Sequence, residues 1–443
     1  MGGQGSEQEN KNRRLDAATG AGERGGRDGL GCNRGLSMPA IAQPRKLTYW
    51  GGLVLSDTAH KLLIDAVTAW GATNKVETEV VLINVNEITQ KVSAAIASGT
   101  LPDVFDVGLE LLTLLSRQEV FAKVDDVYER IGATHGGWFD GPAKASDMTA
   151  IAGGRTAIPF GVSGNLLMRR KDLLEPAGFT EAPRTWDELV TQAEAINKAP
   201  VSGLGLALSN VGDGNLQTSV LQSFGGRIAD DAGKKVTLDS PETRLWLTWL
   251  KAAWDKGLFA PGNTVWDGSG DNQAYLSGQV GFIANTGSVA VAARKDDPEL
   301  FESTGFSALP AGPIGTISPV SPQSRVINAR SPLVEEGKSL LEHLANSEFM
   351  NEYFQYAIWG PVLKDQEKLP AFDGSNTILN GLLDLAKTGT SPAYPDLFNA
   401  AYADMSANFI IPKLAQRVVV DGWDFDKAIA EAQASTQAIY DKY

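Results

Sequence analysis

The sequence contains very little cysteine and histidine. Its 443 residues include one cysteine, Cys32, and three histidines, His60, His135 and His343. A single cysteine cannot form a disulfide within the chain, and the histidines lie too far apart in sequence to match zinc-binding patterns. No G-x-S-x-G nucleophile elbow occurs either. We therefore predict no metal, no cofactor and no catalytic cysteine or elbow serine.

The sequence also has an excess of acidic over basic residues and no long apolar run. It has 39 Lys and Arg against 53 Asp and Glu, a formal net charge of −14. Such a surface repels nucleic-acid phosphates, so we predict no nucleic-acid partner. No stretch of about 18 apolar residues is present, which excludes a transmembrane helix of ordinary length. The length favours two lobes over one core.

The first residues differ in composition from the rest. Residues 1–44 are rich in Gly, Arg, Glu and Asp and poor in large apolar side chains, which is typical of a disordered tail. Arg13 and Arg14 match the start of a twin-arginine export signal, and Ala40–Ala42 match a cleavage site. Charged residues interrupt the apolar region between them. A degraded export signal and a chance likeness both stay open, and we favour export to the periplasm.

After this tail, strand and helix patterns alternate. The β-α-β-α-β order of the first segments predicts a parallel sheet with right-handed crossovers. The expected segments are strand 46–50, a helix capped by Ser56, strand 76–85, helix 87–97 and strand 101–105. The later ones are strands 156–160, 166–169, 204–208 and 280–284, and helices 186–197, 243–256, 333–359 with a break, and 425–440.

Four motifs occur in an order that matches a known family. They are KVSAAIASGTLPDVF at 91–105, PRTWDEL at 183–189, the segment 224–242 that begins FGGR, and the segment 278–288 with the turn NTGS. From about residue 45 to the end, the chain resembles the extracellular solute-binding proteins of ABC importers. Within that group it is similar to the carbohydrate-binding proteins that include the maltose- and glycerol-phosphate-binding proteins.

The resemblance implies an α/β periplasmic-binding-protein fold with two discontinuous lobes around a hinge and a central ligand cleft. The implied lobe 1 is 45–155 plus 312–365, and lobe 2 is 156–311 plus 366–443. The implied function is the capture of a sugar, polyol or related solute and its delivery to membrane permease subunits, by a monomer that is not an enzyme. A ligand-sensing protein and a cleft enzyme such as a glycoside hydrolase are the alternatives.

Ligands of such proteins bind beyond the carboxyl ends of parallel strands. Trp50, Gly51 and Gly52 follow the first strand, where an indole face can stack on a sugar, although core packing explains Trp50 equally well. Asp106 follows the third strand and can accept hydrogen bonds from ligand hydroxyls, or can cap the next helix.

Further candidates come from the family alignment. They are Phe160, Ser163 and Asn165 at a crossing between lobes; Asn285, Gly287 and Ser288 at a helix start; and, more loosely, Asn215, Ser321, Trp359 and Tyr402. A connecting turn, helix capping and core packing are the respective alternatives. We also consider Arg325 and Arg330 for binding phosphate, and favour a surface role for both.

Overall fold

The computed structural model describes residues 45–53, 56–84 and 87–443. The predictions made for residues 1–44, including the export signal, lie outside the described residues. Within those ranges, no helix combines the length and apolarity needed to cross a membrane.

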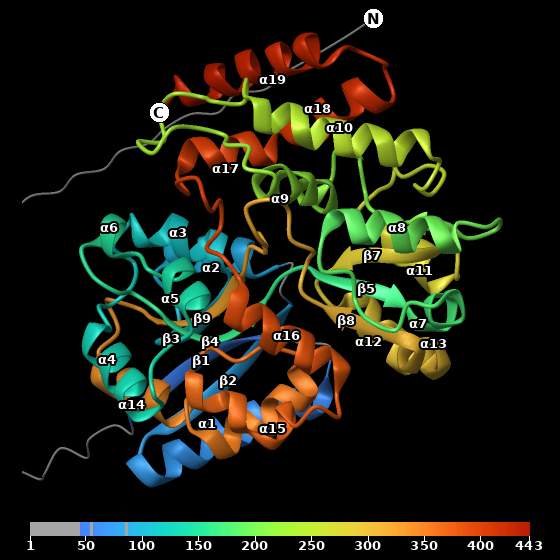
Figure 1. The fold of residues 1–443 in the computed structure, drawn as a ribbon. Helices are drawn as coiled ribbons and strands as arrows, with labels where there is room; N and C mark the ends of the chain where they lie inside the picture. The colour runs from blue at the N-terminus through green and yellow to red at the C-terminus, as the bar shows by residue number, and fades with distance from the viewer. Residues whose placement is uncertain (1–44, 54–55, 85–86) are drawn as a thin grey trace, which may run out of the picture. The chain divides into compact units, whose positions relative to one another are not determined.

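A five-stranded sheet forms the centre of the first lobe (Figure 1). Its strands, in spatial order, are β2 (Glu77–Asn84), β1 (Lys46–Leu53), β3 (Val104–Val107), β9 (Ser321–Ile327) and β4 (Ile158–Ser163). β1 pairs in parallel with β2 and β3, as the β-α-β-α-β pattern predicts. β9 is antiparallel to both β3 and β4, so this sheet is mixed.

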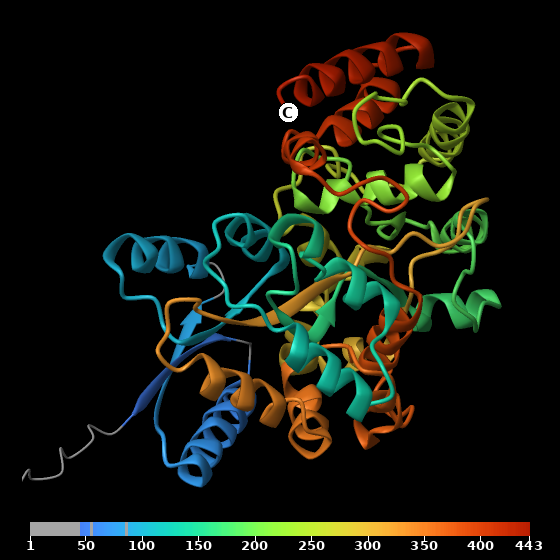
Figure 2. The same ribbon diagram turned by 90° about the vertical axis from the view of Figure 1, so that its left-hand side faces the viewer.

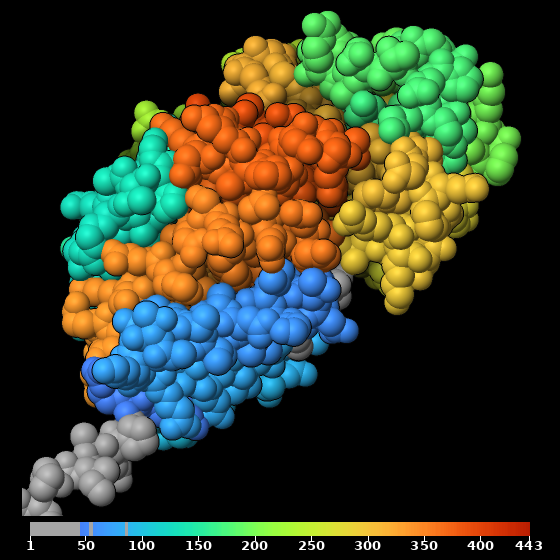
Figure 3. Space-filling model, turned by 90° about the horizontal axis from the view of Figure 1, so that it is seen from below, coloured from blue at the N-terminus to red at the C-terminus, as the bar shows by residue number. Residues whose placement is uncertain are grey.

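Helices cover both faces of the first sheet. They are α1 (Asp57–Asn74), α2 (Ile88–Ser98), α3 (Leu109–Ser116), α4 (Asp125–Thr134), α5 (Asp140–Ala145), α6 (Thr149–Ala152), α14 (Val334–His343) and α15 (Ser347–Ala357). α1 contacts α14 and α15 although they are far apart in sequence, and Figure 3 shows the blue and orange segments side by side. The predicted break within 333–359 is confirmed, since it separates α14 from α15.

A four-stranded sheet forms the second lobe. Its order is β6 (Ser202–Leu204), β7 (Val280–Asn285), β5 (Leu166–Arg170) and β8 (Thr304–Ser307), with β6 and β7 parallel and β5 antiparallel to both its neighbours. The prediction of a strand at 204–208 is wrong beyond Leu204. Leu206 and Leu208 are buried, but the Leu208 N–H donates to the carbonyl of Asn263 in a loop instead of to a ladder.

The second lobe also contains helices from distant parts of the chain. They are α7 (Lys171–Leu174), α8 (Trp186–Ile196), α9 (Leu216–Ser223), α10 (Pro241–Asp255), α11 (Gly270–Leu276), α12 (Ser288–Asp296), α13 (Pro298–Ser303), α17 (Ala400–Ala407), α18 (Ile410–Val419) and α19 (Phe425–Tyr440), with the 3-10 turns η1 (Glu175–Ala177) and η2 (Gly212–Asn215). Figures 1 and 2 show the red α17–α19 group beside the green α9 and α10, which α18 contacts.

The chain passes between the two sheets three times. Gly164 and Asn165 join β4 to β5, residues 308–320 join β8 to β9, and residues 389–399 lead from α16 (Thr377–Thr388) to α17. α16 packs against strands of both sheets, namely β4, β5 and β8, after the short turns η3 (Lys364–Lys368) and η4 (Pro370–Phe372). Strand pairing thus keeps β4 with the first sheet, and the exact lobe boundaries stay a prediction.

Side-chain caps and apolar spacing explain where the helices form. The Ser56 side chain accepts a hydrogen bond from the Ala59 N–H, and the Thr185 side chain accepts one from the Glu188 N–H. Trp246 and Trp249 lie on the buried face of α10 and pack in the core. One large core lies among the α8–α10 and α17–α19 helices, and another extends from the first sheet through α16 to the second.

Candidate functional site

Asp106 was expected to follow the third strand, but it belongs to β3 itself and lies in a buried polar group at the centre of the first sheet. Its carboxylate accepts a hydrogen bond from the Tyr49 hydroxyl at 2.6 Å and another from the Gly52 N–H at 3.2 Å. Arg325 on β9 places Nε 3.7 Å from Asp106 Oδ1 and 3.1 Å from the Tyr49 hydroxyl. Burial raises the pKa of Asp106, and the positive charge of Arg325 opposes that rise.

The surface role that we favoured for Arg325 is wrong. The residue is 2% exposed, and its guanidinium lies 4.0 Å from the centroid of the Phe160 ring. β9 carries it into the sheet between β3 and β4, where it neutralises a carboxylate that burial alone would penalise. Phe160 is therefore covered on one face, and Asp106 already receives hydrogen bonds on both oxygens.

The carboxyl-terminal half of β1 lies directly beside this group. Trp50, Gly51 and Gly52 were expected to follow the first strand, but they belong to β1 and pair with β2 as far as Asn84. Gly51 is buried, and a Cβ on it would come within 2.9 Å of the Leu63 side chain, so only glycine fits without rearrangement. Gly52 is held by Asp106 through its N–H. Trp50 is half-buried and packs against the core that contains Phe105, so part of its indole stays accessible.

The end of β4 brings several predicted residues together. Ser163 pairs with Ser321 across β4 and β9, and its hydroxyl donates to the Ser321 carbonyl at 3.4 Å. Trp359 packs over Gly161, where an added Cβ would lie 2.8 Å from the Trp359 Cβ. Asn165 follows at the crossing between the sheets and is half-buried. The end of β4 thus brings Ser163 beside Ser321 and Gly161 beside Trp359, and the role of these residues in ligand binding stays a prediction.

A second polar group lies at the end of β7 in the second lobe. The buried Asn285 donates from Nδ2 to Asn272 at 2.7 Å and to Asp271 at 3.2 Å. Its Oδ1 accepts from the Gly287 N–H at 3.0 Å and from the Ser288 hydroxyl at 3.1 Å. Asn285 therefore fixes the start of α12, and the hydroxyl of the exposed Ser288 also accepts from Asn272 Nδ2 at 3.3 Å.

Asp213 and Asn215 on η2 belong to the same part of the second lobe. The negative charge of Asp271 contributes, after burial, to raising the pKa of Asp213 to about 6. Asn215 donates from Nδ2 to the Ser406 carbonyl at 3.3 Å. Asn215 was among the residues expected at the site and neither aspartate was, because Asp271 lies in a glycine-rich segment that carries no family motif.

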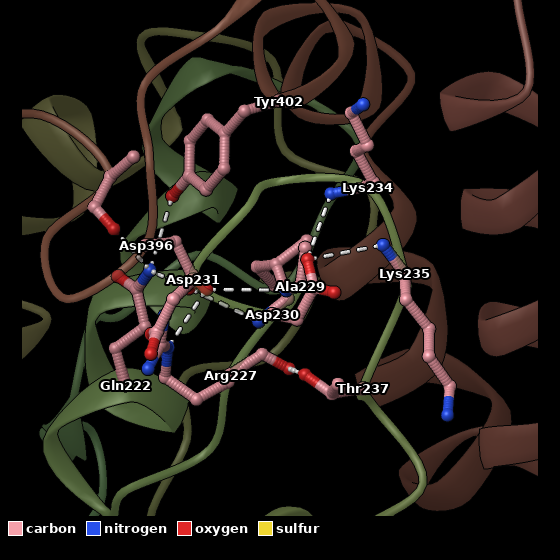
Figure 4. Close-up of polar contacts among 12 residues, drawn as sticks. Gln222, Arg227, Ala229, Asp230, Asp231, Lys234, Lys235, Thr237, Asp396 and Tyr402 are labelled. Carbon is pink, nitrogen blue, oxygen red and sulfur yellow. Dashed lines mark hydrogen bonds and ion pairs between the residues drawn. The ribbon is translucent and has the colours of Figure 1, made fainter.

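Tyr402 lies away from the strand ends, in a buried group centred on Asp396 (Figure 4). The Gln222 amide donates to the Tyr402 hydroxyl at 3.4 Å and to Asp396 Oδ2 at 3.0 Å. Arg227 Nε lies 2.9 Å from Asp396 Oδ1. Tyr402 also packs in the core of the α17–α19 group, and no spacing in the sequence indicated Asp396.

The predicted residues thus fall into separate groups. The group in the first lobe consists of Trp50, Gly51, Gly52, Asp106, Phe160, Ser163, Ser321 and Trp359. The group in the second lobe consists of Asn215, Asn285, Gly287 and Ser288. Asn165 lies at a crossing between the sheets, and Tyr402 lies in the Asp396 group. Their roles in ligand binding stay predictions.

Comparison with known proteins identifies relatives of the whole body of the chain. The model of a family described as bacterial extracellular solute-binding protein matches residues 56–350. A predicted binding protein from Brucella abortus (strain 2308) is 23% identical over 367 residues, which cover 80% of this chain and 84% of that protein. A Deinococcus radiodurans protein named "Probable ABC transporter-binding protein" is 26% identical, over 52% of this chain and 57% of its own length.

Solved structures with the same fold carry names that refer to sugars. The sugar-binding protein MalE from Xanthomonas citri has a TM-score of 0.74 and 19% identity, and the match covers 90% of this chain and 98% of that one. A cyclic α-maltosyl-1,6-maltose binding protein from Arthrobacter globiformis has a TM-score of 0.73 and 18% identity, over 90% of this chain and 100% of the other. The predicted two-lobed α/β fold is confirmed.

Proposed function

The chain belongs to the bacterial extracellular solute-binding protein family, as a solute-binding component of an ABC transporter, and from that premise we propose that it captures a sugar or related polyhydroxylated solute between its two lobes. The observation that carries the proposal is the fold match to sugar-binding proteins over nine-tenths of the chain. The charge of −14 also disfavours a polyanionic solute.

The composition of the strand ends supports a polyhydroxylated ligand. Ser163, Asn165 and Ser288 are neutral groups that both donate and accept hydrogen bonds, which suits sugar hydroxyls. Trp50 and Trp359 are half-buried aromatic residues that can stack on the apolar face of a sugar ring. A sugar hydroxyl left without a partner would cost about 1–3 kcal/mol, which provides selectivity.

Asp106 takes a different role in this proposal from direct contact with solute. Its two oxygens accept from Tyr49 and Gly52, so it holds the carboxyl-terminal half of β1 in place. This contact fixes the backbone of β1 two residues beyond Trp50. Asp106 is thus a positioning residue for the first-lobe half of the site.

The three connections between the sheets provide the proposed hinge. A solute that contacts both lobes binds the closed arrangement more tightly than the open one, and this difference in affinity drives closure. The closed form would then deliver the solute to the permease subunits of the importer. We propose that the protein acts as a periplasmic monomer, in line with its family's extracellular location.

A thermal-shift panel tests the proposal. The full chain is heated with monosaccharides, disaccharides, polyols and glycerol phosphates, because a ligand that binds only the folded state raises the melting temperature. We expect a saturable rise with one class of sugar. A panel without any shift would contradict the assignment to polyhydroxylated solutes.

A further inference from the structure

A cavity of about 600 Å³ lies where helices of the two lobes meet at the start of α16. α15 of the first lobe lines it on one side, and α7, α12 and α13 of the second lobe line it on the other. α16, which packs against strands of both sheets, also lines it. Figure 3 shows the orange segment that contains α15 and α16 beside the yellow segment that contains α12 and α13. A solute in this cavity would therefore contact both lobes.

The cavity adjoins residues that the sequence predicts to bind solute. α12 begins at Ser288 and carries Arg294, which lines the cavity. A Cβ on Gly287, the residue before α12, would lie 3.6 Å from the Ile378 side chain in the first turn of α16. The start of α12 thus touches the helix that forms part of the cavity.

Two positively charged side chains line the cavity without a carboxylate partner. They are Lys171 of α7 and Arg294 of α12, and neither forms an ion pair with another described residue. Most arginines in the described ranges do form one, for example Arg170, Arg244 and Arg417. The cavity therefore provides local positive charge in a chain whose net charge is −14.

One carboxylate also lines the cavity. Glu302 of α13 is exposed and, within the part of the chain that the structure describes, forms no ion pair. The lining thus carries two positive side chains against one negative side chain. The excess of positive charge favours a negatively charged group in the cavity.

Aromatic side chains make the same cavity suitable for a sugar ring. The Arg294 guanidinium lies 5.3 Å from the centroid of the Phe301 ring, and this contact favours one orientation of the guanidinium. Tyr356 is 47% exposed, so its ring offers a face on which the apolar side of a sugar can stack. The exposed Thr377 adds a hydroxyl that can donate and accept hydrogen bonds.

We propose that this cavity binds the anionic group of an acidic or phosphorylated sugar through Lys171 and Arg294, so that the protein prefers such a sugar to its neutral counterpart. This inference rests on the proposed function. Carboxylate and phosphate oxygens both accept charge-assisted hydrogen bonds from ammonium and guanidinium groups. The net charge of the chain disfavours a polyanion, whereas one anionic group needs only the local positive charge of the cavity.

Matched sugars test this inference by isothermal titration calorimetry on the full chain at pH 7. Glucose is compared with glucuronate and glucose 6-phosphate, galactose with galacturonate and galactose 6-phosphate, and cellobiose with cellobiouronate. We expect an anionic member to bind about tenfold or more tightly than its neutral partner, as charge-assisted hydrogen bonds require. The preference should shrink as sodium chloride rises from about 0.02 to 0.5 M, because salt screens exposed charges.

Variants show whether the side chains of the cavity cause the preference. Lys171→Gln and Arg294→Gln should each reduce the ratio of anionic to neutral affinity, and Glu302→Gln should increase it. Lys295→Gln is the matched control, because Lys295 is exposed and follows Arg294 on α12 but does not line the cavity. The ratio is the readout because a merely structural role would weaken both members of a pair equally. Circular dichroism checks that each variant is folded.

The outcomes separate the two levels of the proposal. A preference confined to the uronates or to the phosphates supports the subsite and identifies its anion. Neutral sugars that bind as tightly as their anionic partners, or more tightly, would overturn the anionic subsite and leave the proposed function intact. A preference that Lys171→Gln and Arg294→Gln leave unchanged would overturn the assignment to this cavity. No binding by any sugar, neutral or anionic, would instead contradict the proposed function.

Discussion

Removal of the Asp396 carboxylate should strongly destabilise the second lobe. Each oxygen accepts two hydrogen bonds: Oδ1 from Arg227 Nε at 2.9 Å and the Ala229 N–H at 3.2 Å, and Oδ2 from Gln222 Nε2 at 3.0 Å and the Ile228 N–H at 3.1 Å. The Asp396 side chain is 1% exposed, so water cannot replace it.

The expected loss of stability follows from the donors and the charge that would be left without a partner. A buried hydrogen-bond donor without an acceptor costs about 1–3 kcal/mol, and loss of one member of a buried ion pair costs about 3–5 kcal/mol. We therefore expect Asp396→Ala to lower the free energy of unfolding by about 3–5 kcal/mol. Asp396→Asn should lose nearly as much, because either amide orientation places an NH₂ group against two donors.

Urea unfolding followed by circular dichroism measures this loss. Asp231→Asn is the matched control, because Asp231 pairs with the same Arg227 at 3.2 Å but its side chain is 97% exposed. We expect a change within about 0.5 kcal/mol for the control. A loss below about 1 kcal/mol for Asp396→Ala, comparable with that of an ordinary surface substitution, would refute the reasoning.

Three further predictions concern other groups in the structure. Asp213→Asn should raise the melting temperature of the ligand-free protein at pH 7. The pKa of Asp213 is about 6 in the folded protein and 3.8 in the unfolded chain, so the stability of the wild type falls as the pH rises through that interval. Melts from pH 3.5 to 7.5 check this, and a gain that persists below pH 4 would contradict it. Arg325→Met should lower the free energy of unfolding at pH 7 by about 3–5 kcal/mol, because it leaves Asp106 without its counter-charge. The loss should be smaller in acid, where burial favours the neutral form of Asp106. Equal losses at pH 7 and pH 4 would argue against this explanation. Gly161→Ala should cost about 1–3 kcal/mol, because its Cβ would lie 2.8 Å from that of Trp359, and an unchanged urea midpoint would show that the tryptophan moves aside freely.

Apolar spacing and helix caps made much of the fold predictable. Helix 425–440 was predicted with the bounds of α19, and Ser56 caps α1 as expected, because both signals are local. The strand expected at 204–208 fails for a non-local reason: its apolar residues are buried against a loop that contains Asn263. Periodicity reports burial, and burial alone does not determine which backbone groups pair.

Part of the candidate site could also be selected from the sequence. The family alignment selected Ser163, Ser321 and Trp359. The pairing of β4 and β9 places the two serines opposite each other, and Trp359 packs against Gly161 of β4. The partners of Asp106 and Asp396 could not be predicted, since Arg325 and Arg227 lie more than 150 residues away from them in sequence. Long-range ion pairs depend on how strands and crossing segments are ordered in space.

Calorimetry combined with mass spectrometry of the recovered solute tests the central claim most directly. The sugar that gives the largest thermal shift is titrated into the full chain, and the solute is then released by denaturation and weighed. The account predicts one solute bound per chain and recovered chemically unchanged. Conversion of the sugar to products, or the absence of saturable binding across the panel, would contradict it.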